Sequence, residues 1–472
     1  MFNAPGKPDV HTSPGKRRRW RRWILPAVAL VLCVWFARFC YLRIARRPTP
    51  RPEYWEARLA ELDPPPPGAI SAQKAFNLLT SRPWENVPAV GNVSTDNLYR
   101  ILRGPWNETR PEIAAATMVF QTDAFNDARS EMHRVAQAGW RDFVPLAPDA
   151  LLPSASYLMW TLWLVTHSRW AREHLRDPAA AVDDWLTGLR LSRQLQRQWP
   201  AASRRFAYSR GAFIADEMML AAKEMGKAID TAALAVEIDR IIGPVRQPAA
   251  LLEPSRIGLH CFLEQWYVRE GGDWIDVSEL AAVWGWRLWL PWRPGRKPWR
   301  IWNLASPLFY DLATARKLVD DHFAAAAMCS NLVTCAEAEV KEPSSDAQVL
   351  SGFVWSETSQ TAALLTSYYC MRGKLDAAVA MLAIHEYHRR NGDYPQSLDE
   401  LMPDLLPRLP IDYADRRPLR YRRTGEGYVL YSIGPDGKDN GGEGDAEWEH
   451  RAASNYHNRD IVFSKIRRSG AE

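Results

Sequence analysis

The feature that most restricts the fold of this chain is an apolar run near its N-terminus, WILPAVALVLCVWFA at residues 23–37, which contains no charged residue. With the following RFCYL it makes a span of 20 residues, 23–42, the length that an α-helix needs to cross a bilayer. Arg38 lies near the end of this span, where its side chain can reach the interface, and Trp23 and Trp35 suit interfacial positions. The sequence therefore predicts a single N-terminal transmembrane helix.

The flanks of this span predict its processing and its orientation. Neither a small-residue cleavage site nor a lipoprotein-type cysteine accompanies it, which indicates an uncleaved signal-anchor. Seven Lys and Arg residues lie in the basic tail 1–22, against four in residues 43–51. By the positive-inside rule, we expect a single-pass bacterial inner-membrane protein with a cytoplasmic tail and a periplasmic body. A cytoplasmic body with inverted topology is the alternative.

Charge and cysteine usage narrow the class of protein further. The 60 Lys and Arg residues exceed the 55 Asp and Glu by only five, and KRRRWRR at residues 16–22 alone carries six positive charges. Because nucleic-acid binding needs a basic face on a folded domain, we expect no nucleic-acid partner.

The six cysteines form no CxxC motif. Cys329 and Cys335 are spaced for a disulfide in an oxidising compartment, and buried free thiols are the other interpretation.

The middle of the chain has the spacing of helices. Two proline clusters within residues 43–69 predict a linker of stiff spacers on either side of one short helix. Residues 70–371 then predict an α-helical bundle, with 206–226 and 306–340 each interpreted as one amphipathic helix. Asp177 and Pro178 suit the N-cap and first turn of another helix. The fold class is thus mostly α.

A tryptophan-rich stretch interrupts this helical body. WGWRLWLPWRPGRKPWRIW, residues 284–302, contains six tryptophans and five cationic residues, separated by prolines. One interpretation is a hairpin that rests on the membrane interface, where tryptophan and arginine each keep one end in water. The other is that the tryptophans pack on the helices with arginines stacked over them.

Catalytic motifs are not evident in the sequence. No G-x-S-x-G, H-E-x-x-H or phosphate loop is present, so we do not expect an enzyme. His385 and His388 lie one helical turn apart without a third ligand and are interpreted as solvated. Asp320, Asp321 and His322 are interpreted as a polar helix face. An envelope enzyme with its site in the helical body remains an alternative.

From Lys374 the pattern changes to that of a small α+β module. Residues 375–395 predict a helix that ends at Asn391-Gly392, and Ser397 with Glu400 fit a capping box at the start of a short second helix. PLRYRR and YVLYSIG flank TGEG and predict an antiparallel hairpin, and RDIVF predicts a further strand. Between them lies YSIGPDGKDNGGEGD, residues 431–445.

This order resembles the globular part of the type II secretion major pseudopilin. The likeness covers roughly residues 372–466 and predicts a pilin-like domain, with a tail at 467–472. The matching residues are Tyr387, Gly392, Tyr394, Pro395, Asp412, Pro418, Tyr421, Ser432, Gly434, Asp436, Gly437, Gly441, Gly442, Glu443, Gly444, Asp460 and Ile461.

In the pseudopilin family the Gly/Asp loop binds one calcium ion. The resemblance implies as ligands the Ile433 carbonyl, the Asp436 side chain and an acidic residue beyond the double glycine, Asp445 or Glu443. Asp439 and Asn440 add oxygens nearby. Calcium takes six to eight oxygen ligands, and glycines let several carbonyls converge. The alternative is a metal-free cluster of Asx and glycine turns.

Two departures from the family pattern shape the functional expectation. One extra residue separates Asp436 from the double glycine. No Gly-Phe-Thr-Leu-Ile-Glu prepilin peptidase site precedes the apolar helix, which lies over 300 residues from the module. We therefore expect an anchored structural or interaction protein with a protein partner in secretion or envelope assembly. A component of a pseudopilus is the alternative.

Overall fold

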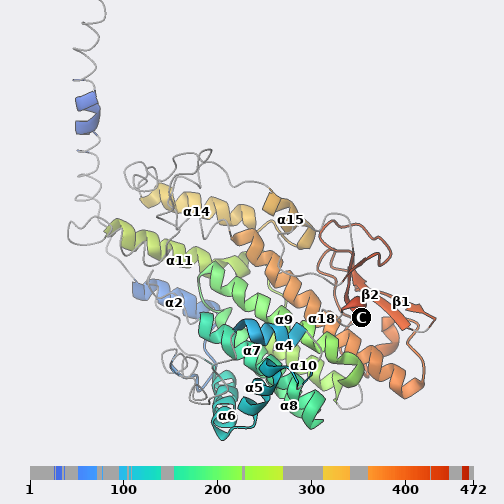
Figure 1. Cartoon of the computed structure of the whole chain (residues 1–472). Helices are drawn as coiled ribbons and strands as arrows, with labels where there is room; N and C mark the ends of the chain where they lie inside the picture. Colours follow the sequence, from blue (N-terminus) through green and yellow to red (C-terminus); the bar gives the residue numbers. More distant parts are fainter. Residues whose placement is uncertain are drawn as a thin grey trace, which may run out of the picture.

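The computed structural model describes residues 26, 28–34, 37, 52–71, 77, 95–103, 106–107, 109–139, 154–225, 229–268, 312–340, 360–425, 427–445 and 460–466. The tryptophan-rich stretch 284–302, the tail 467–472 and most of the expected transmembrane span lie outside these ranges. The described part is mostly helical with a small sheet near the C-terminus, as the sequence predicts (Figure 1).

The elements are listed here in chain order. The helices are α2 (Pro52–Leu62), α4 (Thr95–Arg103), α5 (Pro111–Phe120), α6 (Asp123–Ala138), α7 (Ser154–Trp170), the π-helical turn η3 (Ala171–Leu175), α8 (Pro178–Leu195), α9 (Ala201–Met225), α10 (Thr231–Ile242), α11 (Pro248–Val268), α14 (Leu312–Ala326), α15 (Leu332–Val340), α18 (Thr361–Asn391) and the 3-10 turns η5 (Leu398–Leu401) and η7 (Phe463–Lys465). The strands are β1 (Arg420–Thr424), β2 (Gly427–Ser432), β3 (Gly444–Asp445) and β4 (Asp460–Val462).

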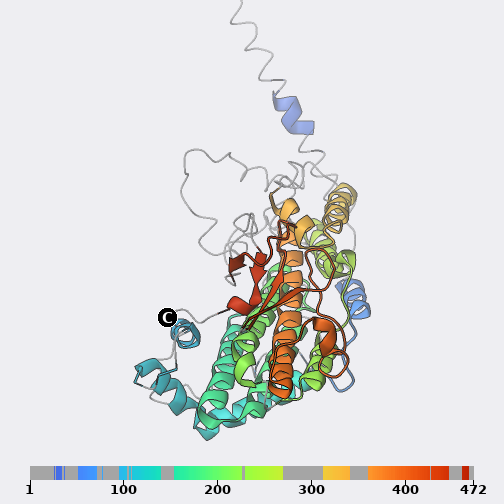
Figure 2. The same cartoon turned by 90° about the vertical axis from the view of Figure 1, so that its right-hand side faces the viewer.

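Helices α9 and α18 form the centre of the body. They pack along each other more extensively than any other described pair and run side by side in both views (Figures 1 and 2). Helices α7 and α8 pack on α9, while α6 and α10 contact α8. Helix α11 contacts α14 and α2, and α15 lies against α18. The sheet covers part of the C-terminal half of α18.

Helix α18 is longer than the sequence suggested. It starts at Thr361, so the predicted start after Lys374 is wrong, and the expected boundary at residues 371/372 lies within a continuous helix. Two polar residues of this helix are buried and have partners on other helices. Lys374 Nζ donates to Asp216 Oδ2 at 2.7 Å, and Glu386 Oε2 accepts from Thr231 Oγ1 at 2.8 Å.

The sheet has the order β1-β2-β4-β3. The predicted hairpin is confirmed: β1 and β2 pair in antiparallel register with Thr424 opposite Gly427. β2 also pairs antiparallel with β4, where the sequence predicted a strand, and the two-residue β3 runs parallel to β4. Leu430, Ile461 and Phe463 from this region belong to the same buried cluster as the body helices, so the core is continuous from body to sheet.

Two local predictions are wrong. Residues 306–340 do not form one helix, because α14 ends at Ala326 and a turn precedes α15. Asn331 begins the new helix, as its Oδ1 accepts from the Thr334 backbone N–H at 2.9 Å. The capping box also fails: Ser397 makes no side-chain cap, and Glu400 instead accepts from the Tyr387 hydroxyl at 2.6 Å. The cap at Asp177 is confirmed, since it accepts from the Ala180 N–H.

The expected linker is partly built into the body. Its predicted short helix is α2, which packs on α11 through Leu59 in a small core with Trp199, Ile257 and Cys261. Just beyond α2, the carboxylate of Asp63 pairs with three arginines, at 2.6 Å from Arg193, 3.2 Å from Arg246 and 3.9 Å from Arg197. Residues 52–70 are therefore fixed on the body rather than acting as a free spacer.

No helix within the described ranges is both long and apolar enough to cross a bilayer. The described residues of the expected span that are helical lie at 26, 28–34 and 37. Among the described cysteines, Cys261, Cys329 and Cys335 are buried free thiols, so the structure favours the thiol interpretation over a Cys329–Cys335 disulfide.

The continuous core predicts coupled unfolding of body and sheet. Leu430→Ala removes a fully buried side chain of β2, at a cost of about 2–5 kcal/mol. Hydrogen exchange under mildly denaturing conditions should then show amides of α9 losing as much protection as those of β2. Val236→Ala, on an exposed side chain of α10, is the control and should leave both unchanged. Loss confined to β2 would mean that the sheet unfolds independently.

Candidate functional site

The Gly/Asp loop, residues 433–445, leaves β2 and returns to the sheet at β3. Its backbone requires glycine at close approaches. Gly442 has φ +82°, and a Cβ there would lie 2.9 Å from the Val429 side chain. A Cβ on Gly444 would lie 1.9 Å from the backbone oxygen of Asp460. Side chains at these positions would push the loop off the sheet, so the glycines set its compact path.

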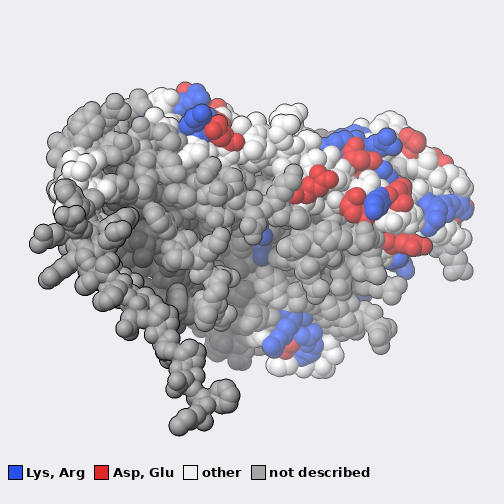
Figure 3. All heavy atoms as spheres, turned by 90° about the horizontal axis from the view of Figure 1, so that it is seen from above, with Lys and Arg blue, Asp and Glu red and all other residues white. Residues whose placement is uncertain are grey.

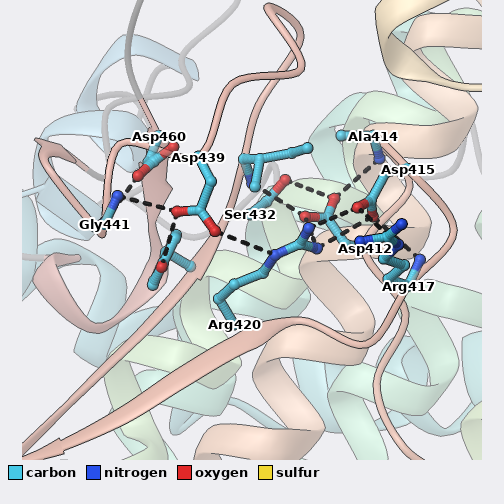
Figure 4. A network of polar contacts seen from close by, with 12 residues as sticks. Asp412, Ala414, Asp415, Arg417, Arg420, Ser432, Asp439, Gly441 and Asp460 are labelled. Carbon is cyan, nitrogen blue, oxygen red and sulfur yellow. Dashed lines mark hydrogen bonds and ion pairs between the residues drawn. The ribbon is translucent and has the colours of Figure 1, made fainter.

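Asp460, the first residue of β4, closes the loop. Its buried carboxylate accepts hydrogen bonds from two loop amides, Gly442 N–H at 2.7 Å and Asn440 N–H at 3.1 Å. Its own N–H donates to the Glu443 carbonyl at 3.3 Å. Figure 4 shows Asp460 facing this part of the loop. This end of the loop is thus held by a carboxylate that lies about twenty residues further along the chain.

Asp412 fixes the other end of the loop. Its side chain is fully buried and accepts from Ser432 Oγ at 2.7 Å, Ile433 N–H at 3.0 Å and Ala414 N–H at 2.9 Å. Arg420 Nη1 adds a fourth hydrogen bond at 3.2 Å. Burial raises the pKa of Asp412, although these hydrogen bonds act in the opposite direction.

Arg420 links three aspartates along the sheet (Figure 4). Besides Asp412 it pairs with Asp415, Nη2 to Oδ2 at 2.5 Å, and its Nε lies 3.8 Å from Asp439 Oδ2. Asp439 Oδ1 in turn accepts from the Tyr431 hydroxyl at 3.0 Å and from the Gly441 N–H at 2.9 Å. Burial and the hydrogen bond to Asp439 raise the pKa of Tyr431 to about 12.

The expected calcium ligands differ in whether their oxygen atoms already have partners within the described part of the chain. Asp439 is already engaged by Arg420 and Tyr431. Asp436 is different: its Oδ1 accepts from the Lys438 N–H at 3.2 Å, but its Oδ2 is buried and has no hydrogen-bond partner in the described part of the chain. A buried carboxylate oxygen without a partner is costly unless a cation or water completes it.

The remaining expected ligands lie close to Asp436 in the sequence. Ile433 is buried and Asn440 is half-buried, while Glu443 is exposed. Asp445 lies in β3 opposite Ile461, and its side chain is outside the described part. Within the described part, no group of three or more His, Cys, Asp or Glu side chains is arranged to hold a metal ion.

Sequence reasoning matched Asp412 and Asp460 to a family pattern but assigned neither of them a role in the loop. Their partners are mainly backbone N–H groups that lie far away in the sequence, which no local pattern displays. The one available signal was the position of Asp460 at the start of a predicted strand.

The helical body contains a buried ion-pair cluster of its own. Asp184 on α8 is fully buried and pairs with His167 Nδ1 of α7 at 2.6 Å and with Arg129 Nε of α6 at 2.6 Å. His133 contacts the same carboxylate at 3.4 Å and Asp183 at 2.5 Å. Aromatic rings pack around His167, and the ion pairs of the cluster join α6, α7 and α8.

Two histidine interpretations need correction. His385 and His388 are not solvated but half-buried against tyrosines. His385 Nε2 lies 3.2 Å from the Tyr428 hydroxyl, and His388 stacks on Tyr394 with ring centroids 4.1 Å apart. Burial, followed by the charge of His388, lowers the pKa of His385 to about 4.

The interpretation of residues 320–322 as a polar helix face is also incomplete. Asp320 pairs with Arg256 and His260 of α11, each at 2.8 Å. His322 Nε2 lies 3.2 Å from the Thr361 hydroxyl. These residues therefore connect α14 to neighbouring helices.

Charges of both signs are mixed on the described part of the face that Figure 3 shows. In Figure 3 the described Lys and Arg residues lie among Asp and Glu residues on the right, the side where the C-terminal sheet lies in Figure 1. Such a mixture suits short-range ion pairs, of which Arg420–Asp415 and Arg423–Asp393 are examples in the sheet region.

Comparison of the whole chain with protein-family models, with curated proteins and with solved structures finds no match.

The cluster around Asp184 predicts a specific pH dependence. Burial alone would raise the pKa of Asp184, but the hydrogen bonds from His133 and His167 and the charge of Arg129 hold it below its usual value. The stabilisation is therefore present above the unfolded pKa of about 4 and is lost as the pH falls through the lower folded pKa. Asp184→Asn should lower the free energy of unfolding at pH 7 by about 3–5 kcal/mol.

Urea unfolding between pH 7 and pH 3 measures this effect. The gap between the wild type and Asp184→Asn should narrow below about pH 4. Asp183→Asn is the matched control, because that side chain is 47% exposed, and it should cost much less. A gap that does not change with pH would contradict the assignment.

Proposed function

We propose that this chain is a membrane-anchored extracytoplasmic structural or interaction protein with a calcium-stabilised, pseudopilin-like C-terminal module. It would serve as an accessory in bacterial secretion or envelope assembly. The observation that carries the proposal is the unpartnered, buried Asp436 Oδ2 in a glycine-shaped loop, at a position that the resemblance assigns to calcium.

The membrane anchor is supported by the sequence and by exposure. The span 23–42 has the length and apolar character of a transmembrane helix. Five of its described apolar residues are not covered by the rest of the described chain, each with 51–66% of its surface exposed: Val28, Leu30, Val31, Leu32 and Val34. A continuous exposed apolar helix surface needs a cover, and a bilayer supplies one.

The calcium site is supported by the donor chemistry of the loop. Asp436 would supply a carboxylate oxygen, and the Ile433 carbonyl and the acidic residue beyond Gly441-Gly442 would complete the site. Asp439 contributes by holding Gly441 and Arg420 in place. Calcium bound there would join the two ends of the loop and stiffen the module. The chain itself already orients the loop through Asp412 and Asp460.

The proposed interaction role rests on the sheet edge. The strand order places β1 at one edge, and β1 carries Arg422 and Arg423 next to half-buried Tyr421. An edge strand can accept a strand of a partner protein through backbone hydrogen bonds. The module would thus be the docking part and the helical body its support.

Calcium should stabilise the full-length protein. Thermal melting in detergent, in calcium and in EGTA, compares the two states. Calcium at ~100 times its Kd adds about 2.7 kcal/mol, which should raise the midpoint by several degrees. Asp436→Asn should abolish this shift, because it removes the charge of the unpartnered carboxylate.

Two controls define the result. Asp399→Asn, on an exposed aspartate of η5, should keep the calcium shift. Magnesium should not replace calcium, since it requires a smaller octahedral site. An equal shift in wild type and Asp436→Asn, or no shift in either, would reject the calcium loop.

The proposed orientation predicts the activity of a reporter. Alkaline phosphatase fused after Glu472 should be active in bacterial cells, because the enzyme folds only outside the cytoplasm. The same reporter fused within residues 1–22, before the span, should be inactive. The opposite pair of activities would show that the body lies in the cytoplasm.

A further inference from the structure

Helices α11 and α14 run antiparallel, and their ion pairs give the register. Arg256 and His260 of α11 each pair with Asp320 at 2.8 Å, whereas Glu264, one turn later, pairs with Arg316. Residues nearer the C-terminus of α11 therefore pair with residues nearer the N-terminus of α14. The C-terminus of α11 at Val268 and the N-terminus of α14 at Leu312 therefore lie at the same end of the pair.

Helix α2 points toward this end as well. Leu59 packs with Ile257 and Cys261, and Trp55, one turn earlier, reaches Glu264 with its Nε1 at 2.7 Å. Trp55 also stacks on His260, with centroids 5.7 Å apart. Residues nearer the N-terminus of α2 therefore contact residues nearer the C-terminus of α11. The N-terminus of α2 at Pro52 thus lies at the same end of the body as the other two helix ends.

The length of chain before Pro52 restricts how far this end can lie from the membrane. The expected span ends at residue 42, and only nine residues, RIARRPTPR, connect it to α2. At ~3.3–3.6 Å per residue, ten steps reach about 35 Å at most. A compact body of roughly 300 residues has a radius of gyration of about 19 Å and hence a diameter of roughly 50 Å. The connection is shorter than the body is wide.

The charge of this connection favours contact with lipid. Residues 43–51 contain four arginines and no acidic residue, and they precede an exposed Tyr54 on α2. Basic residues next to a bilayer are attracted to anionic headgroups. The sequence that joins Val268 to Leu312 leaves and returns at this same end and includes the six tryptophans of residues 284–302.

We infer that the end of the body formed by the N-terminus of α2, the C-terminus of α11 and the N-terminus of α14 lies against the surface of an anionic lipid bilayer. This inference rests on the proposed membrane anchor and adds the orientation of the body on the membrane. In Figure 1 the sheet lies on the other side of the body from this end, so β1 and the Gly/Asp loop face away from the lipid.

Fluorescence quenching in vesicles tests the orientation on the full-length protein. A p-azidophenylalanine residue replaces Tyr54 on α2 or, as the matched control, Met118 on α5, and each is coupled to the same dye. Both positions are exposed, at 47% and 55%, and α5 lies far from α2 in Figure 2. The vesicles contain phosphatidylethanolamine, phosphatidylglycerol and a lipid with a quencher on its headgroup.

Strong quenching at position 54 and little at position 118 is the expected result. Flotation of the same samples separates the two proposals. If the protein floats with the vesicles but both dyes are quenched weakly or equally, the docked orientation is wrong and the anchor stands. Stronger quenching at position 118 also overturns the orientation. If the protein does not float, the anchor is wrong and the orientation fails with it.

Discussion

The structure depends on the burial of α18 against α9 and the helices around them. A helix that is apolar on one stripe needs one partner, but α18 is buried on most of its surface and requires cover from several sides. The body helices supply one side and the sheet supplies another through Leu430 and Phe463. Buried charge is costly unless it is paired, and Lys374 of α18 is paired with Asp216 of α9. The sheet therefore shares one apolar core with the body helices.

Buried carboxylates with hydrogen-bond partners also hold the Gly/Asp loop in place. Asp412 and Asp460 are both nearly inaccessible, and both use their oxygens to satisfy backbone amides at the ends of the loop. These hydrogen bonds hold the backbone of the loop in place. Asp436 differs from both, because its Oδ2 has no hydrogen-bond partner in the described part of the chain. Arg408 pairs with Asp239 of α10 at 2.9 Å and with Asp376 of α18 at 2.8 Å, and so connects the segment after η5 to the body. Paired charges rather than apolar contacts alone define how the module sits.

The outcome of the sequence analysis shows which information is local. The cap at Asp177, the hairpin around residues 424–427 and the strand at β4 were predictable because turn and cap residues act on their immediate neighbours. The start of α18 was not, because Lys374 looks like a surface residue until Asp216 of a distant helix is placed beside it. The break before α15 depended on Asn331, whose preference for caps is weak evidence within an apolar run. In the candidate site, the glycines and Asp436 were visible in the sequence, whereas the roles of Asp412 and Asp460 required the tertiary fold.

The attachment of Asp63 has a mechanical consequence. Its carboxylate is shared by Arg193, Arg197 and Arg246, and Arg197 also donates to the Asp63 carbonyl at 2.6 Å. These arginines come from the end of α8, from the turn that follows it and from the segment before α11. Tension applied through the N-terminal segment would pass along α2 to this point and spread into three parts of the body.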